Sequence, residues 1–169
     1  MIAGPDHVRR MAAYNRWMNR KVYDVCAGLS ADALAEDRGA FFGSVLGTLN
    51  HLLFGDVAWL GRFRTGVAGA SGPDVMLHED FATLRAAREL FDEEIILWAA
   101  GVDEVWLAEP FTYVSGIDGV ERTRPTWSLV AHMFNHQTHH RGQLTTLLTQ
   151  IGLDVGATDI PFMPEEELA

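Results

Sequence analysis

Four long segments with helical periodicity constrain the fold more than any other feature of this sequence. In each segment, apolar residues recur every three or four positions, as they do along one face of an α-helix. The segments span about residues 6–29, 44–65, 79–100 and 126–151. Because each helix must bury its apolar face against another element, the pattern predicts an all-α fold, a four-helix bundle.

A small β-hairpin is predicted between the third and fourth helical segments. Two β-prone runs, at residues 111–115 and 120–124, flank the sequence GIDG, which has the composition of a tight turn. No linker, internal repeat or low-complexity stretch interrupts the chain. We therefore expect residues 1–169 to form a single domain.

The composition excludes several classes of protein. The single cysteine, Cys26, rules out an intrachain disulfide framework and a cysteine-rich zinc motif. A formal net charge of -10 argues against a nucleic-acid partner, because binding to phosphates needs clustered Lys and Arg. The N-terminus lacks the apolar core of a signal peptide, and no apolar run is long enough to span a bilayer. We therefore expect a cytoplasmic protein that does not contact membranes.

The last helical segment carries four histidines within nine positions: His132, His136, His139 and His140. An even distribution of histidines would place roughly 0.4 in such a window. On a helical wheel His140 lies near the middle of the apolar stripe, His136 lies on the same side, and His139 points toward solvent. A buried imidazole needs a polar partner, and a divalent ion would satisfy two imidazoles one turn apart.

A third inward-facing histidine candidate, His51, lies in the second helical segment. Small residues neighbour it on the helix surface, at Gly47, Thr48, Gly55 and Ala58. These residues would let a partner helix or a ligand approach the imidazole closely, although they could equally serve only to set the distance between two helices. Together, His51, His136 and His140 indicate a metal site inside the bundle.

Polar residues within apolar stripes are candidates for hydrogen bonding to the metal ligands. Asn15 and Gln137 are such residues, and Asp56 is a third candidate. An equally good alternative is that Asn15 and Gln137 pair with each other or with the backbone. Gly142 costs a helix about 1 kcal/mol relative to alanine, which suggests that another backbone approaches it closely.

Three stretches of the sequence resemble one known family. The stretches GTLNHLLFGDVAWLGRF, HMFNHQTHHRGQLTTLLTQIG and MAAYNRWMNRKVYD are similar to those of the DinB-like (damage-inducible, YfiT-type) four-helix-bundle metalloproteins. The resemblance implies one divalent ion, nickel or zinc, held by His51, His136 and His140, with His139 not a ligand. It also implies a homodimer, and a small-molecule substrate or thiol as the binding partner.

The resemblance leaves the reaction open. Relatives in the wider superfamily transfer bacillithiol or isomerise maleylpyruvate with mycothiol, which implies a low-molecular-weight thiol as co-substrate. Three imidazoles leave a coordination position free, as in catalytic metal sites. The hypotheses are a thiol-dependent S-transferase or isomerase, a hydrolase using metal-bound hydroxide, and a non-catalytic metal-binding or dimerisation protein. The HExxH motif of metalloproteases is absent.

Overall fold

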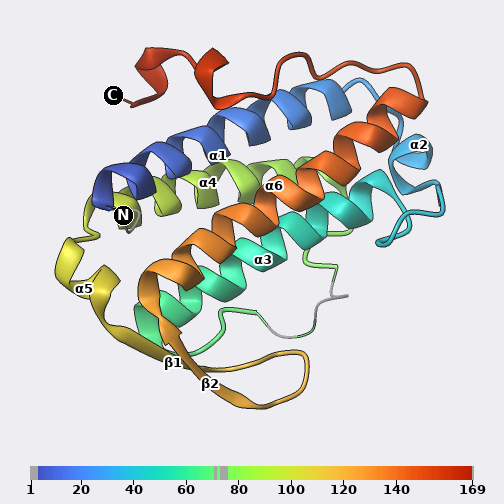
Figure 1. Cartoon of the computed structure of the whole chain (residues 1–169). Helices are drawn as coiled ribbons and strands as arrows, with labels where there is room; N and C mark the ends of the chain where they lie inside the picture. The colour runs from blue at the N-terminus through green and yellow to red at the C-terminus, as the bar shows by residue number, and fades with distance from the viewer. Residues whose placement is uncertain (1–3, 71, 73–75, 169) are drawn as a thin grey trace.

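The computed structural model describes residues 4–70, 72 and 76–168. The long helices in this part of the chain are α1 (Pro5–Cys26), α3 (Val45–Thr65), α4 (Phe81–Ala100) and α6 (Thr126–Gln150), and they form a bundle (Figure 1). Helix α1 packs against α4 and α3 packs against α6, while α1 also contacts α6 and α3 contacts α4. The predicted all-α four-helix bundle is confirmed, with each long helix within a few residues of its predicted range.

Capping side chains explain where the central helices begin. The Ser44 side chain accepts a hydrogen bond from the Gly47 amide at 3.0 Å at the start of α3. At the start of α4, the Asp80 side chain accepts one from the Thr83 amide at 2.9 Å. Each bond satisfies an amide that has no partner in the first helical turn. Helix α4 therefore begins at Phe81, two residues later than predicted.

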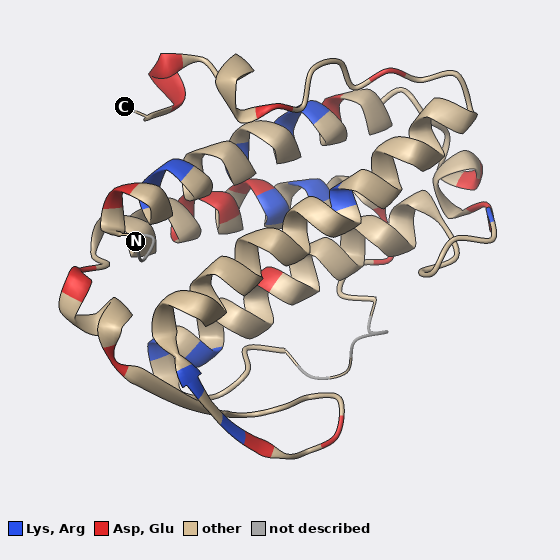
Figure 2. Ribbon diagram, viewed as in Figure 1, with Lys and Arg blue, Asp and Glu red and all other residues tan. Residues whose placement is uncertain are grey.

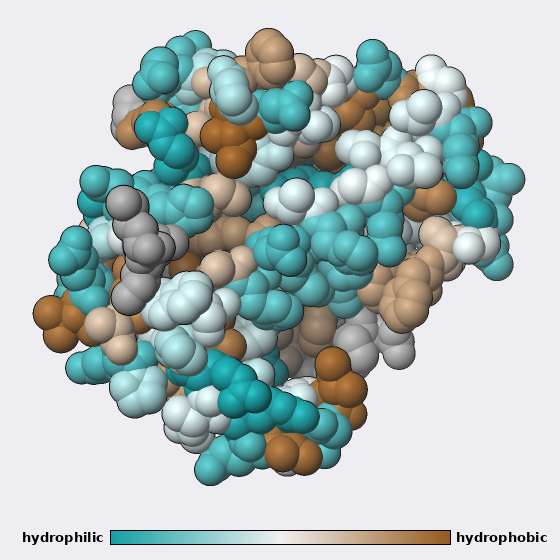
Figure 3. Space-filling view, viewed as in Figure 1, coloured by the Kyte–Doolittle hydropathy of each residue, from teal (hydrophilic) through white to brown (hydrophobic). Residues whose placement is uncertain are grey.

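The predicted hairpin is present beside the ends of α3 and α6 (Figure 1). Strands β1 (Pro110–Val114) and β2 (Glu121–Pro125) pair antiparallel, with Thr112 opposite Thr123. Exposed apolar side chains surround its turn, at Val114, Ile117 and Val120. Figure 3 shows brown, hydrophobic patches at this end of the molecule. The apolar periodicity did not predict four short helical elements: α2 (Ala31–Ala35), α5 (Glu104–Ala108), η1 (Ile160–Phe162) and η2 (Glu165–Leu168).

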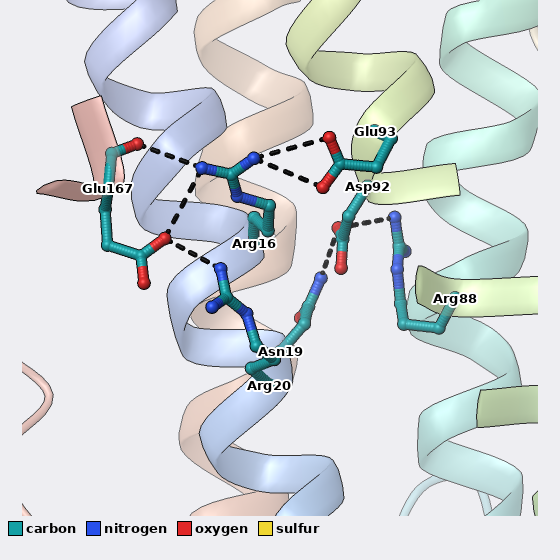
Figure 4. A network of polar contacts seen from close by, with 7 residues as sticks. All are labelled: Arg16, Asn19, Arg20, Arg88, Asp92, Glu93 and Glu167. Carbon is teal, nitrogen blue, oxygen red and sulfur yellow. Dashed lines mark hydrogen bonds and ion pairs between the residues drawn. The ribbon is translucent and has the colours of Figure 1, made fainter. Parts of the chain in front are cut away.

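The C-terminal segment lies over the outer side of α1 (Figure 1). Tyr14 donates a hydrogen bond from its hydroxyl to the carbonyl of Thr158 at 2.6 Å. The Glu167 carboxylate lies 2.7 Å from Arg20 and 3.5 Å from Arg16, and Figure 4 shows both guanidinium groups turned toward it. These contacts close the bundle on the side opposite α3.

The core consists of two apolar clusters with a layer of polar side chains between them. One cluster includes Met18, Leu49, Leu84 and Leu148, and the other includes Val8, Leu60, Ile95 and Val130. Between them lies a set of six buried residues that we call the central polar layer: Asn15, Asn19, Asp56, Arg88, Asp92 and Arg141. Every long helix contributes to this layer, so polar contacts fix the relative heights of the helices.

Gly142 does not have the role that the sequence suggested. A Cβ atom added at this position would meet nothing within 4 Å, so no other backbone approaches it within the described chain. The interpretation of Gly142 as a close-contact residue was wrong.

The open surroundings of Gly142 lead to a prediction about stability. Because its backbone is helical and unobstructed, Gly142→Ala should raise the free energy of unfolding by about 1 kcal/mol, the difference in helix propensity. Urea denaturation would measure this change. A destabilised variant would show that the position makes a contact the monomer does not reveal.

No helix among the described residues combines the length and apolar character needed to cross a membrane.

Candidate metal centre

The structure brings the three predicted ligands together. His51 lies in the second turn of α3, and His136 and His140 lie one turn apart on α6. The Nε2 atoms of His51 and His136 are 3.1 Å apart, and one nitrogen from each of the three imidazoles lies within 4.8 Å of the others. Two nitrogens bound to one tetrahedral zinc at 2.0–2.1 Å lie about 3.3 Å apart. The spacing therefore fits one shared ion after small rotations of the rings.

The surroundings of His51 show why small residues flank it. A Cβ atom at Gly55 would lie 2.7 Å from Cε1 and 3.0 Å from Nδ1 of His136. Real Cβ contacts are not this short, so a side chain at position 55 would displace the imidazole. The small residues therefore do more than set a helix distance, because Gly55 provides the space that His136 occupies.

This close approach leads to a prediction about Gly55→Ala. The added methyl group should push His136 away from His51 and weaken zinc binding by at least tenfold, roughly 1.4 kcal/mol. Competition with a chromophoric chelator would measure the zinc affinity. Gly142→Ala is the matched control, because it places a methyl group on α6 in open space. Equal zinc affinity in both variants would contradict the geometry.

Phe42 forms one wall of the site. Its ring stacks on His51 with centroids 3.7 Å apart and planes 19° apart, and it lies edge-on to His140 at 5.2 Å. Phe42 was not predicted from the sequence because it lies in the turn before α3, where there is no apolar periodicity to indicate a buried side chain. The available signal was the aromatic pair Phe41–Phe42 directly before the helix-capping Ser44.

Gln143 orients the third candidate ligand. Its Oε1 lies 2.7 Å from Nδ1 of His140. An amide oxygen only accepts, so Nδ1 carries the proton and Nε2 keeps a lone pair available for an ion. Histidine ligands commonly donate their second ring N–H in this way.

The hydrogen bond predicts that Gln143→Leu will lower metal affinity. Loss of a hydrogen-bond partner of a ligating imidazole typically costs about 10- to 100-fold in affinity. Zinc titration of the variant beside the wild type would measure the loss. Thr146→Ala is the control. Thr146 is exposed and lies nearly one helical turn after Gln143 on α6, so its loss should leave the zinc affinity unchanged. If Gln143→Leu binds zinc as tightly as the wild type, Gln143 does not orient His140 for metal binding.

The environment of the imidazoles on α6 favours their neutral form. Burial, followed by repulsion from the neighbouring histidines, lowers the pKa of His136 to about 3. Burial also lowers the pKa values of His140 and His132. Neutral imidazole is the form that binds metal, so these side chains need not release protons near neutral pH. Arg141 is the sole charged residue of α6, and Figure 2 shows the rest of this helix without Asp, Glu, Lys or Arg.

The other histidines of α6 lie around the cluster. His139 is exposed, as the helical wheel predicted, although its ring centroid is 4.8 Å from that of His140. His132 lies 6.0 Å from His136 and edge-on to Trp59 at 5.1 Å. Neither belongs to the group of three whose nitrogens converge.

The predicted supporting residues lie beside the cluster, in the bundle interior. Gln137 donates to the carbonyl of Leu52, which follows His51, at 2.7 Å. Asn15 donates to Asp56 at 3.3 Å, and Asp56 also accepts from Arg88 at 2.7 Å. For Gln137 the backbone alternative is therefore observed, whereas Asn15 and Asp56 belong to the central polar layer. A direct influence of these three residues on the ligands stays a prediction.

The bundle, with three imidazoles from two helices brought close together, defines a class of protein: the all-α proteins with a candidate three-histidine metal centre. Comparison with known proteins identifies the family within that class. The DinB family model matches residues 5–168, and the chain belongs to the DinB family.

Two relatives illustrate the similarity. Protein DinB of Bacillus subtilis is 25% identical over 177 residues, which cover 97% of this chain and 99% of that protein. The crystal structure of a DinB-like protein from Bacillus cereus matches with a TM-score of 0.67 and 20% identity, covering 93% of this chain and 99% of that one. The family predicted from the sequence is confirmed, and the structural match supports the fold.

Proposed function

We propose that this protein is a metalloenzyme in which His51, His136 and His140 hold one divalent ion, zinc or nickel. The observation that carries the proposal is the 3.1 Å separation of the His51 and His136 Nε2 atoms, with a His140 nitrogen nearby. Three protein ligands leave at least one coordination position for a reactant. Family membership supports the same assignment.

We further propose that the reactant is a low-molecular-weight thiol, used in S-transfer or isomerisation of a small molecule. Neutral imidazoles do not offset the charge of a divalent ion, and a bound ion would stabilise the thiolate form of such a reactant. Other side chains of the protein shape the site around the proposed thiol. Phe42 presents an apolar wall beside His51, and Gln143 holds His140 with Nε2 free. An apolar, partly buried wall suits a polarisable sulfur better than it suits hydroxide and its hydration shell.

Elemental analysis followed by a thiol screen tests the proposal. The purified protein should carry one zinc or nickel per chain, and the loaded protein should bind at least one of bacillithiol, mycothiol and glutathione. Mass spectrometry would detect thiol adducts with electrophilic acceptors. If no thiol binds, the thiol proposal fails. Ester hydrolysis without thiol, rising with pH through a pKa near neutrality, would indicate the hydrolase instead.

The homodimer implied by the resemblance stays a proposal about assembly. Trp17, Trp59 and Trp127 are poor candidates for the interface, because each is only partly exposed and packs against a core cluster. Leu90 and Leu97 on the outer face of α4 are better candidates, because each is 72% exposed. Light scattering of the wild type and of Leu90→Glu would test whether this face pairs with a second copy.

A further inference from the structure

Arg62 is a buried cation without an anionic partner among the described residues. It lies in the last turn of α3 and is 8% exposed. Its Nη1 donates to the carbonyl of Ala58, in its own helix, at 3.3 Å. Burial lowers the pKa of the guanidinium, and no carboxylate opposes that shift.

The other buried arginines of the bundle have different polar partners. Arg88 lies 2.7 Å from Asp56 and 2.9 Å from Asp92, and Arg141 is bonded to Asn15 and Asn19. Removing a charge from water is costly unless the charge is paired. The chain carries 23 acidic residues, yet within the described structure none is placed against Arg62. Arg141 has amides as its direct partners, but Asp56 and Asp92 lie near enough to oppose the lowering of its pKa by burial, whereas no carboxylate of the described chain acts on Arg62 in this way.

The neighbours of Arg62 cover its faces and leave its edge free. The guanidinium carbon lies 4.9 Å from the Trp59 ring and 5.9 Å from the Tyr113 ring. On the hairpin side, a Cβ atom added at exposed Gly116 would lie 3.7 Å from Nη2, so the glycine leaves this atom uncovered. An arginine that served to fasten the hairpin would donate to a hairpin carbonyl, but the bond in the described structure goes to α3. Figure 2 shows further Lys and Arg positions where α3 meets the hairpin.

A row of rings connects Arg62 with the three-histidine centre. Trp59, which contacts the guanidinium, lies edge-on to His132 at 5.1 Å, and His132 lies 6.0 Å from His136. Arg62 follows His51 by eleven residues on the same helix, which corresponds to about 16 Å along its axis. The two sites therefore suit the two ends of an elongated molecule.

We propose that Arg62 binds the carboxylate end of an elongated small molecule, whose body lies along Trp59 and His132 and whose other end reaches the three-histidine centre. The planar guanidinium edge suits a carboxylate, with which it forms two parallel hydrogen bonds. The placement of the far end rests on the proposed function. The anion site itself does not, because it depends only on Arg62 and its neighbours.

The first test uses metal-free protein, so that it examines the anion site alone. Sodium octanoate is titrated while NMR follows the arginine Nε–Hε and tryptophan indole signals, and octanol serves as the uncharged probe. Octanoate should shift the Arg62 and Trp59 signals saturably and should bind about tenfold or more tightly than octanol. Equal binding of the two probes, or no saturable octanoate binding, would overturn the proposal.

Variants assign the effect to one guanidinium. Arg62→Met retains the apolar stem and should lower octanoate affinity to that of octanol, whereas Arg62→Lys should fall between Met and the wild type. Arg64→Met is the matched control, because Arg64 lies two residues away, is more exposed and pairs with Glu94. Equal losses in the Arg62→Met and Arg64→Met variants would show a general charge effect and overturn the assignment. Urea denaturation confirms that each variant is folded.

The second test uses zinc-loaded protein and asks whether one ligand spans both sites. Mercaptoalkanoates of increasing chain length are compared by calorimetry with mercaptoalkanols of the same length. The carboxylate should strengthen binding only in the longer chains, and Arg62→Met should abolish that gain. Thiol binding without a carboxylate gain at any length would overturn the shared ligand. Failure of every thiol to bind would instead contradict the proposed function, while the octanoate result still decides the anion site.

Discussion

His136→Ala is expected to abolish stoichiometric metal binding, whereas His139→Ala is expected to leave it intact. His136 occupies the central place in the cluster, because its Nε2 faces that of His51 at 3.1 Å and its ring lies 4.3 Å from that of His140. Without it, two imidazoles on different helices remain, and no described side chain takes its place in the converging group. His139 is adjacent in sequence but exposed, so its loss removes no ligand.

Two measurements check this expectation. Elemental analysis after dialysis against trace zinc gives the metal content of each variant. Thermal unfolding gives a second readout, since an ion that binds only the folded state raises the melting temperature with its concentration. Added zinc should raise the melting temperature of the wild type and of His139→Ala, but not that of His136→Ala. Equal zinc retention by both variants would refute the assignment of the ligands.

The residues of the site differ in how far the sequence could predict them. His136 and His140 were predictable because helical geometry alone places residues four apart on one face. His51 needed more, namely its small neighbours and the resemblance to a family. Phe42 lies in a turn, so its stacking on His51 depends on how the chain folds back and leaves no periodic signal.

The same distinction applies to the fold. The long helices could be predicted because their apolar stripes repeat over several turns, whereas α2 and α5 have five residues each and contain too few turns for a period to show. Gly142 was misinterpreted because a glycine in a helix indicates close packing only when something packs there. Asn15 and Asp56 were recognisable as buried polar residues, but their partners on α6 and α4 depend on the heights at which the helices pack.

The central polar layer leads to the second large effect. Its hydrogen bonds and one ion pair form a closed ring. Arg88 donates to Asp56 and forms an ion pair with Asp92, the two aspartates accept from Asn15 and Asn19, and Arg141 donates to both asparagines. Figure 4 shows the part of this ring in which Asp92 lies between Asn19 and Arg88. Arg88 is 1% exposed and Asp56 is fully buried, so water cannot replace a lost partner.

Arg88→Met is therefore expected to lower the free energy of unfolding by about 3–5 kcal/mol at pH 7, the usual effect of removing one partner from a buried ion pair. The methionine fills most of the space but leaves Asp56 and Asp92 without their cation. Urea denaturation would measure the loss. Arg85→Met is the matched control, because Arg85 lies nearly one turn earlier on α4, pairs with Asp24 and Glu89, and is partly exposed. The control should lose about 1 kcal/mol or less.

The loss in Arg88→Met should shrink in acid. Burial raises the pKa of Asp56 from 3.8 to about 6 although Arg88 opposes the shift, and burial also raises the pKa of Asp92. Without Arg88 both pKa values rise further, so at pH 5 the folded variant holds these carboxyls protonated while the unfolded chain has released most of those protons. The folded state then binds more protons than the unfolded state, and each such group adds about 1.4 kcal/mol of stability per pH unit of acidification.

The free energy of unfolding of Arg88→Met should therefore be closer to that of the wild type at pH 5 than at pH 7. Adding Asp56→Asn to Arg88→Met should recover part of the loss at pH 7. A pH-independent loss, or one no larger than that of Arg85→Met, would show that the ring does not hold these aspartates as buried charges.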